Sequence, residues 1–129
     1  MARIMVVDDE RDVVTLIKFL LEKEGHAITE AFNGAEALEL LGLDPVKPDV
    51  QRPELVVLDI MMPIVDGYTV CQRMQQDPRC RRIPIVILTA RGQMKELFSG
   101  TPNIADYLEK PFDPKMLRER IAAILAKDR

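Results

Sequence analysis

Residues 53–67 read PELVVLDIMMPIVDG and place a single carboxylate directly after a run of apolar residues. The run from Leu55 to Leu58 has the composition of a strand buried on both faces, because apolar residues follow one another without polar alternation. The run ends at Asp59, and Pro63 and Gly67 then indicate a loop. A buried strand that delivers one acid to its end raises the question of what that acid meets there.

Length and composition indicate one soluble globular domain. The chain has 129 residues, of which 47% are hydrophobic and 30% charged, and its formal net charge is -3. This balance excludes a disordered chain, and the mild acidity excludes the basic surface that nucleic acids or anionic membranes attract. We therefore expect a single domain over residues 1–129 with no effector domain attached, no direct contact with nucleic acid and no insertion into a membrane.

The N-terminus and the cysteines favour a cytoplasmic location. The first residues, MARIMVVDDE, reach acidic side chains too early for a signal peptide. Cys71 and Cys80 do not form a CxxC pair, so we interpret them as a core residue and a loop residue in a reducing compartment.

Apolar runs and helical periodicity alternate along the chain. The predicted strands are Ala2–Val7, His26–Phe32, Glu54–Leu58, Ile83–Leu88 and Ala105–Glu109. The first predicted helix carries an apolar stripe of Val13, Leu16, Ile17, Leu20 and Leu21. The other predicted helices are one capped by Asn33, Gly67–Gln76, a short Gln93–Ser99 and one opened by Pro114. The fold prediction is an α/β doubly wound five-stranded parallel sheet in the order 2-1-3-4-5, flanked by five helices and flavodoxin-like.

Polar residues stand at the ends of four strands that this order makes neighbours. Asp8, Asp9 and Glu10 follow the first strand, and Asp59 ends the third. Thr89 and Lys110 end the fourth and fifth strands in the same way. The sheet opens a crevice where its connections leave to opposite faces, between the first and third strands, so we expect Asp8, Asp9 and Asp59 to converge there.

Three crowded carboxylates repel one another unless a cation lies among them. Hard oxygen ligands on loops open to water suit Mg²⁺, which keeps several waters and favours phosphate partners. Lys110 offers a positive charge and Thr89 a hydroxyl donor beside this cluster. A carboxylate between a divalent cation and an ammonium group is well placed to attack a phosphoryl group.

The chain resembles a response-regulator receiver domain of two-component signalling over essentially its whole length, in the single-domain form of the chemotaxis regulators. Each supporting motif is weak alone, but the four in this order and at strand ends are specific. They are VVDDE (Val6–Glu10), VVLDIMMPIVDG (Val56–Gly67), ILTA (Ile87–Ala90) and YLEKPF (Tyr107–Phe112).

The resemblance implies a Mg²⁺-dependent phosphoacceptor. Asp59 would accept a phosphoryl group from the phosphohistidine of a histidine kinase or a phosphotransfer protein. Asp9 and Asp59 would ligate Mg²⁺ directly, together with the backbone carbonyl of Met61, whereas Asp8 would act mainly through water. The protein would be no enzyme in the usual sense, because it would catalyse only its own phosphorylation and slow dephosphorylation.

The resemblance also implies a switch. Thr89 and Lys110 would bind the phosphoryl oxygens, Tyr107 would turn inward when Thr89 moves, and the Lys110–Pro111 bond would be cis. The change would pass to an unidentified downstream protein through the helix at Gln93–Ser99, the last strand and the last helix. A half-buried tyrosine on an edge strand is common without a switch, so both interpretations of Tyr107 stay open.

Three other functions fit parts of the pattern. A receiver-like scaffold that never carries phosphate has no need of the whole set of polar residues. A phosphatase of the haloacid-dehalogenase type would need DxDxT after the first strand, where this chain has VVDDERD. A flavin-binding protein would need a phosphate loop there, and an acidic loop repels phosphate.

On the first helix, Val14 and Phe19 lie off the main apolar stripe and suit either flank packing or docking onto a kinase.

Overall fold

The computed structural model of the chain describes residues 2–90 and 103–127. The strands are β1 (Arg3–Val7), β2 (Ala27–Ala31), β3 (Leu55–Asp59), β4 (Ile85–Ala90) and β5 (Ile104–Lys110). The helices are α1 (Arg11–Glu22), α2 (Gly34–Leu40), α3 (Gly67–Gln75) and α4 (Pro114–Lys127). All five predicted strands are confirmed, and no end differs from the predicted one by more than two residues.

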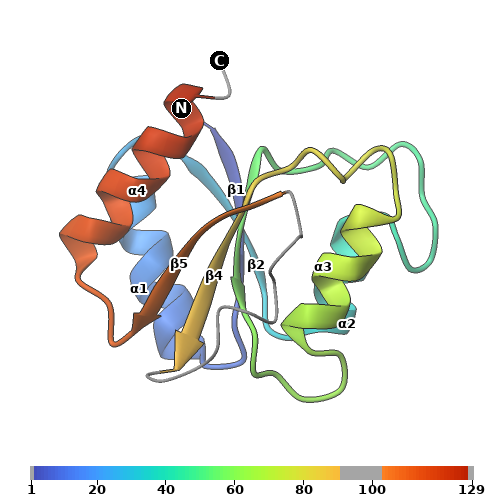
Figure 1. Cartoon of the computed structure of the whole chain (residues 1–129), viewed down its shortest axis with the longest axis horizontal. Helices are drawn as coiled ribbons and strands as arrows, with labels where there is room; N and C mark the ends of the chain where they lie inside the picture. Colours follow the sequence, from blue (N-terminus) through green and yellow to red (C-terminus); the bar gives the residue numbers. More distant parts are fainter. Residues whose placement is uncertain (1, 91–102, 128–129) are drawn as a thin grey trace.

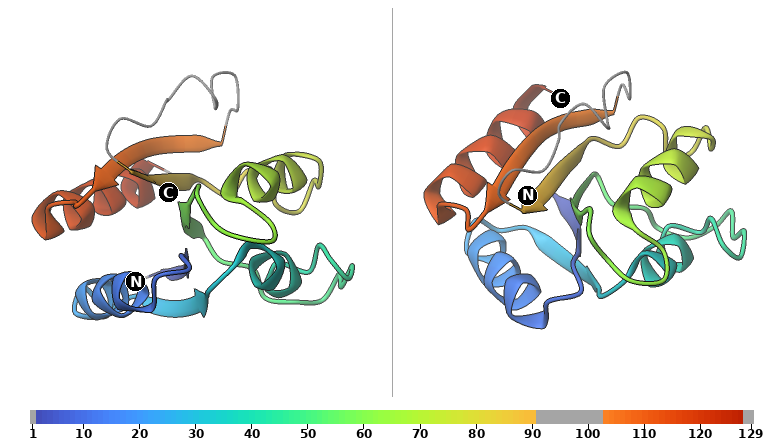
Figure 2. Two further views of the ribbon diagram at one scale, coloured as in Figure 1. Left: turned by 90° about the horizontal axis from the view of Figure 1, so that it is seen from below. Right: turned by 60° about the horizontal axis from the view of Figure 1, so that its bottom comes forward.

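The strands form one parallel sheet in the order β2-β1-β3-β4-β5, as predicted (Figure 1). Helices α1 and α4 cover one face, and α2 and α3 cover the other (Figure 2). The chain leaves β1 toward the α1 face and leaves β3 toward the α3 face. The crevice between the carboxyl ends of these two adjacent strands is therefore the topological switch point of the sheet.

Each face of the sheet has its own apolar core, because consecutive side chains of a strand point to opposite faces. In β3, Val56 and Leu58 belong to the core under α2 and α3, whereas Leu55 and Val57 belong to the core under α1 and α4. All four are fully buried, which explains the unbroken apolar run in the sequence.

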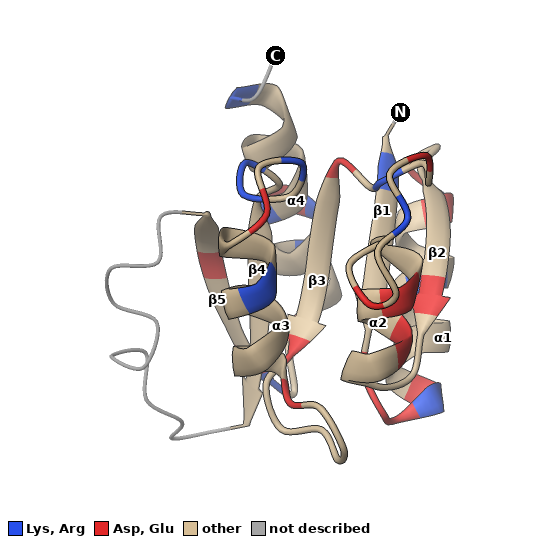
Figure 3. Ribbon diagram, turned by 90° about the vertical axis from the view of Figure 1, so that its right-hand side faces the viewer, with Lys and Arg blue, Asp and Glu red and all other residues tan. Residues whose placement is uncertain are grey.

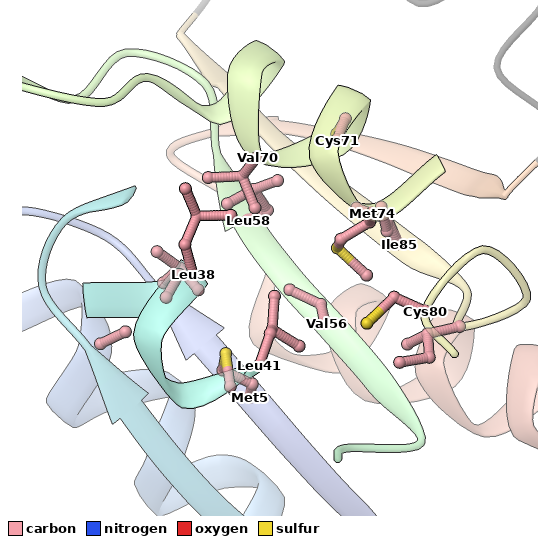
Figure 4. Packing of buried hydrophobic residues seen from close by; sticks show 14 of the residues in the cluster. Met5, Leu38, Leu41, Val56, Leu58, Val70, Cys71, Met74, Cys80 and Ile85 are labelled. Carbon is pink, nitrogen blue, oxygen red and sulfur yellow. The ribbon is translucent and has the colours of Figure 1, made fainter. Parts of the chain in front are cut away.

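The core under α2 and α3 is rich in flexible, sulfur-containing side chains (Figure 4). Met5 and Met74 are buried in it together with Cys71 and Cys80, and both cysteines are free thiols. The loop position predicted for Cys80 is right, but its side chain is completely buried, because the turn after α3 folds back onto the sheet. Burial raises the pKa of Cys71 to about 12, so this thiol is inert at neutral pH.

The α1 helix carries the expected apolar stripe, but two of its positions differ from the prediction. Val14 is completely buried in the core, whereas Leu16, which was placed on the stripe, is 42% exposed. The docking interpretation of Val14 is therefore wrong. Phe19 is 56% exposed, and the Lys23 ammonium lies 4.8 Å from its ring centroid.

Four of the five predicted helices are confirmed. Asn33 caps α2 as expected, since its side-chain oxygen accepts a hydrogen bond from the backbone N–H of Glu36 at 2.8 Å. The fifth predicted helix, Gln93–Ser99, lies outside the described residues. Within the described ranges no helix is long and apolar enough to cross a membrane.

The long loop between α2 and β3 is held in one conformation by hydrogen bonds from Arg52. The Arg52 guanidinium donates hydrogen bonds to the carbonyl oxygens of Leu41 at 2.9 Å and Lys47 at 3.0 Å. Gly42 adopts a φ of 74°, and a Cβ there would meet the Lys47 carbonyl and the Arg52 side chain. The loop packs at the amino-terminal edge of the sheet, opposite the crevice, because it leads directly into the start of β3 and its Arg52 carbonyl accepts hydrogen bonds from Arg3 at the start of β1.

Candidate functional site

Four neighbouring strands deliver polar side chains to the carboxyl end of the sheet. Asp8 directly follows β1, Asp59 is the last residue of β3, and Thr89 and Lys110 lie at the ends of β4 and β5. Figure 3 shows acidic segments at the tip of β3 and in the connection from β1 to α1. The prediction that these residues meet at one edge of the sheet is confirmed for Asp8, Asp59 and Lys110 by direct contacts.

Asp8 is completely buried, and its position is fixed by the backbone around it. Its N–H donates to the carbonyl oxygen of Ala31 in β2 at 3.1 Å, and its Oδ1 accepts from the N–H of Glu10 at 2.9 Å. Its Oδ2 lies 2.7 Å from the ammonium nitrogen of Lys110. No other described residue donates to that oxygen. Because a buried carboxylate is costly without a positive charge beside it, Asp8 depends on the Lys110 ammonium.

Lys110 is the cation at the centre of the site. Its Nζ lies 2.7 Å from Asp8 Oδ2, 3.2 Å from Glu10 Oε1 and 3.6 Å from Asp59 Oδ2. Burial lowers the pKa of this ammonium, but the contact with Asp8 and the charge of Asp59 outweigh burial and raise it. Lys110 therefore carries a positive charge at neutral pH, and the Lys110–Pro111 peptide bond is cis as expected.

Asp59 is a buried acid whose pKa is strongly raised. It is 4% exposed, and its Oδ1 accepts a hydrogen bond from the N–H of Met61 at 3.4 Å. Burial, followed by the negative charge of Asp8, raises the pKa of Asp59 to about 7. Burial is also the main cause of a raised pKa at Asp8. The raised pKa values of Asp8 and Asp59 show that the nearby positive charge of Lys110 does not fully offset the burial of these two carboxylates.

The acidic cluster has the composition of a magnesium site. Asp8, Asp9 and Asp59 each offer a carboxylate oxygen, and these oxygens lie within 4.8 Å of one another. Asp8 and Asp59 are buried and Asp9 is exposed, so the cluster opens to solvent on one side. A hard cation that keeps some of its water fits this donor set. The expected participation of the Met61 carbonyl stays a prediction.

Thr89 lies on β4, the strand next to Asp59, and Tyr107 lies on β5, one strand further out. Thr89 is 3% exposed, and it sits one residue beyond Leu88, the β4 partner of Asp59 in the sheet. Tyr107 is half-buried and packs against the core under α2 and α3. The Arg120 guanidinium donates to the Tyr107 carbonyl oxygen at 3.0 Å and to Asp106 Oδ1 at 2.9 Å. The backbone of Tyr107 is thus fixed, and the proposed movement concerns its side chain.

The loop after β3 is tight and strained next to the acceptor candidate. A Cβ on Gly67 would collide with the carbonyl oxygen of Asp59, which explains why only glycine fits there. Ile64 has a φ of 72°, a left-handed conformation that is costly for a β-branched residue, and its side chain is 86% exposed. Close packing of Gly67 under Asp59 fixes the direction in which the carboxylate leaves the sheet.

Glu10 is the site residue that sequence reasoning did not place in the cluster. The only sequence signal was its position directly after Asp8 and Asp9. A glutamate at the start of a helix is common on the surface, and its partner Lys110 lies 100 residues away in the chain. Sequence order alone could not reveal that contact.

The family described as "Response regulator receiver domain" matches residues 4–122. The chain is 38% identical over 129 residues to the DNA-binding dual master transcriptional regulator RpaA of Synechocystis. This alignment covers 98% of the chain and 50% of RpaA. The chain spans about half the length of this regulator and of the transcriptional regulatory protein PhoP of Bacillus subtilis, to which it is 37% identical over 126 residues.

Two solved structures share the fold over nearly all of the chain. One is the N-terminal domain of a response regulator receiver protein of Methanoculleus marisnigri, with 37% identity, a TM-score of 0.72 and 98% of both chains covered. The other is the receiver domain of a sensor histidine kinase of Pseudomonas aeruginosa, with 26% identity, a TM-score of 0.75 and 92% of both chains covered. The second holds a magnesium ion coordinated in its active site cleft.

Proposed function

Because the chain belongs to the response regulator receiver domain family of two-component signalling, we propose that it is a phosphoacceptor switch that uses Asp59. The phosphoryl group comes from a histidine kinase or a phosphotransfer protein. The observation that carries this proposal is the position of Asp59, buried at the switch point of the sheet between an acidic pair and the Lys110 ammonium.

The transfer step needs a nucleophile in line with the phosphorus atom. A carboxylate oxygen of Asp59 forms a bond to phosphorus while the P–N bond of the donor's phosphohistidine breaks. The imidazole nitrogen leaves with the electron pair of that bond, so no further reactant is required. Transfer therefore needs Asp59 in its ionised form, which the positive charges of the site favour.

The residues present fit a magnesium ion. Asp9 and Asp59 would hold it directly, with the Met61 carbonyl, and Asp8 would act mainly through water. When bound, Mg²⁺ supplies positive charge that offsets the repulsion between Asp59 and an incoming phosphoryl group. The buried Asp8 Oδ2, which meets only the Lys110 ammonium among the described residues, supports a need for further positive charge.

Lys110 and Thr89 have separate tasks around the phosphoryl group. The Lys110 ammonium, 3.6 Å from Asp59 Oδ2 before transfer, binds a phosphoryl oxygen after it. The Thr89 hydroxyl binds another and moves toward Asp59, and Tyr107 fills the vacated space. A shift of only about 2.7 kcal/mol changes the ratio of the two states 100-fold.

The output passes to a downstream protein. We assign it to β5 and α4 together with the segment Gln93–Ser99, which the sequence predicts to be helical and which lies outside the described residues; Thr89 and Tyr107 would transmit the change to them. A single domain over residues 1–129 and a cytoplasmic location complete the proposal. Family membership and two buried free thiols support that location.

Intact-mass measurement after treatment with phosphoramidate and Mg²⁺ tests the proposal. The wild type and the control Asp12→Asn, an exposed acid on α1, should each gain one phosphoryl group. Asp59→Asn, and the wild type in EDTA, should gain none. A wild type that takes no phosphoryl group from small donors in Mg²⁺ would support the scaffold function instead.

A further inference from the structure

Glu10 shares the Lys110 ammonium with the buried acids of the site. Its Oε1 lies 3.2 Å from Lys110 Nζ, whereas Asp8 Oδ2 lies 2.7 Å from the same nitrogen. The two acids differ in burial, because the Asp8 side chain is completely buried and the Glu10 side chain is 64% exposed. The Asp8 contact is thus fixed by the fold, and the Glu10 contact can open without exposing the core.

Helix capping does not explain Glu10. The residue occupies the N-cap position of α1 in an extended conformation, but its side chain makes no capping hydrogen bond. Serine, threonine, aspartate and asparagine are the side chains that cap at this position, since they are short enough to reach the free N–H groups. The carboxylate of Glu10 turns instead toward Lys110.

The backbone of Glu10 is held firmly, so the direction of its side chain is reproducible. Its N–H donates to Asp8 Oδ1 at 2.9 Å, and its carbonyl oxygen accepts from the N–H groups of Val13 at 3.1 Å and Val14 at 3.2 Å. These three hydrogen bonds join the residue to the acidic pair on one side and to the first turn of α1 on the other. The side chain therefore starts from a fixed point beside the crevice.

We infer that Glu10 is a positioning residue that holds the Lys110 ammonium over the β1–α1 connection until a phosphoryl group on Asp59 draws it away. This inference rests on the proposed function, because the competitor of Glu10 is the phosphoryl oxygen. The ammonium lies 3.6 Å from Asp59 Oδ2 and must move closer to that side to bind the new group. Glu10 opposes this movement of the ammonium, and the opposition is weak because the Glu10 carboxylate is largely exposed to solvent.

The size of the effect follows from the exposure of the pair. Exposed ion pairs change an equilibrium constant by about 1.5-fold to 5-fold. Loss of the Glu10 charge should therefore favour the phosphoryl-bound state by that factor. Removal of any negative charge near the crevice would also favour binding of a phosphoryl group. The experiment must therefore separate the loss of the Glu10–Lys110 contact from the loss of charge alone.

Glu10→Gln is the test variant and Asp12→Asn its matched control. Each removes one negative charge near the start of α1, but the described residues give Asp12 no ion pair. Beryllium fluoride with Mg²⁺ serves as the phosphoryl mimic, and its affinity is measured by NMR titration. Glu10→Gln should bind the mimic about 1.5-fold to 5-fold more tightly than wild type, and Asp12→Asn should differ from wild type by clearly less.

The Lys110 Nζ resonance gives a readout that a merely structural role would not move. Glu10→Gln should shift this resonance in the free protein and leave it close to the wild-type position in the mimic-bound protein, where the contact is already broken. Equal effects of both variants, weaker mimic binding by Glu10→Gln, or an unshifted Lys110 resonance in the free protein would overturn the inference alone. A wild type that binds no mimic would refute the proposed function, and the inference with it.

Discussion

Replacement of the acceptor candidate should stabilise the fold. In Asp59→Asn the side chain keeps its shape, but the buried negative charge at this position is removed. Asp59 is 4% exposed, and its pKa is raised from the ordinary value of 3.8 to about 7, first by burial and second by the charge of Asp8. The wild type therefore loses stability whenever this buried group has to ionise.

The magnitude follows from the pKa difference between the folded and unfolded chains. One pKa unit corresponds to about 1.36 kcal/mol, so the shift is worth at most about 4 kcal/mol. A pKa raised by folding contributes stability below the unfolded value, and that contribution disappears as the pH rises through about 7. The advantage of Asp59→Asn over wild type should therefore widen by roughly 2–3 kcal/mol between pH 5 and pH 8.

Urea unfolding in EDTA, followed by circular dichroism at pH 5, 6, 7 and 8, measures this difference. Asp12→Asn, an exposed change on α1, should stay within about 0.5–1 kcal/mol of wild type and should not follow the widening course. Added Mg²⁺ should narrow the gap at pH 8, because the ion stabilises the ionised wild type only. An Asp59→Asn protein with a constant advantage, or with lower stability than wild type at pH 8, would refute the reasoning.

Three further changes have expected outcomes. Gly67→Ala should slow phosphorylation by phosphoramidate and destabilise the fold by about 1–3 kcal/mol, because the new Cβ collides with the Asp59 carbonyl; urea unfolding and intact mass check it. Lys110→Met should destabilise the metal-free protein by about 3 kcal/mol at pH 8 and by less at pH 5, since it leaves the buried Asp8 unpaired; a loss that does not depend on pH would contradict this. Arg52→Ala removes the guanidinium hydrogen bonds to two loop carbonyls and should destabilise by about 2 kcal/mol. Phosphorylation should continue at the wild-type rate, and slower phosphorylation would show that the loop before β3 reaches the site.

The sheet could be predicted because its strands are buried on both faces. The run from Leu55 to Leu58 has no polar interruption, and such runs have few alternatives in a chain of this size. The helix faces were harder, because α1 carries apolar residues on more than one side. Val14 and Leu16 are two residues apart and therefore lie on nearly opposite sides of the helix, and the sequence alone does not show which of them faces the sheet. Packing against the sheet decided it, and packing buried Val14 and exposed Leu16.

The site could be predicted as far as the order of strands determines it. Asp8, Asp59 and Lys110 meet because they stand at the carboxyl ends of β1, β3 and β5, which lie at the same edge of one parallel sheet. The contact of Glu10 with Lys110 depends on side-chain direction, and the strain at Ile64 depends on a loop conformation that no local pattern encodes. Both are properties of the folded chain rather than of a motif.

The most direct test of the central claim is to find the residue that carries the phosphoryl group. Borohydride reduces an aspartyl phosphate to homoserine, and peptide mass mapping then locates the change. After phosphoramidate and Mg²⁺ we expect conversion of Asp59 alone, and none in EDTA. Homoserine at Asp8 or Asp9, or conversion of Asp59 at an equal rate without the metal, would contradict the account.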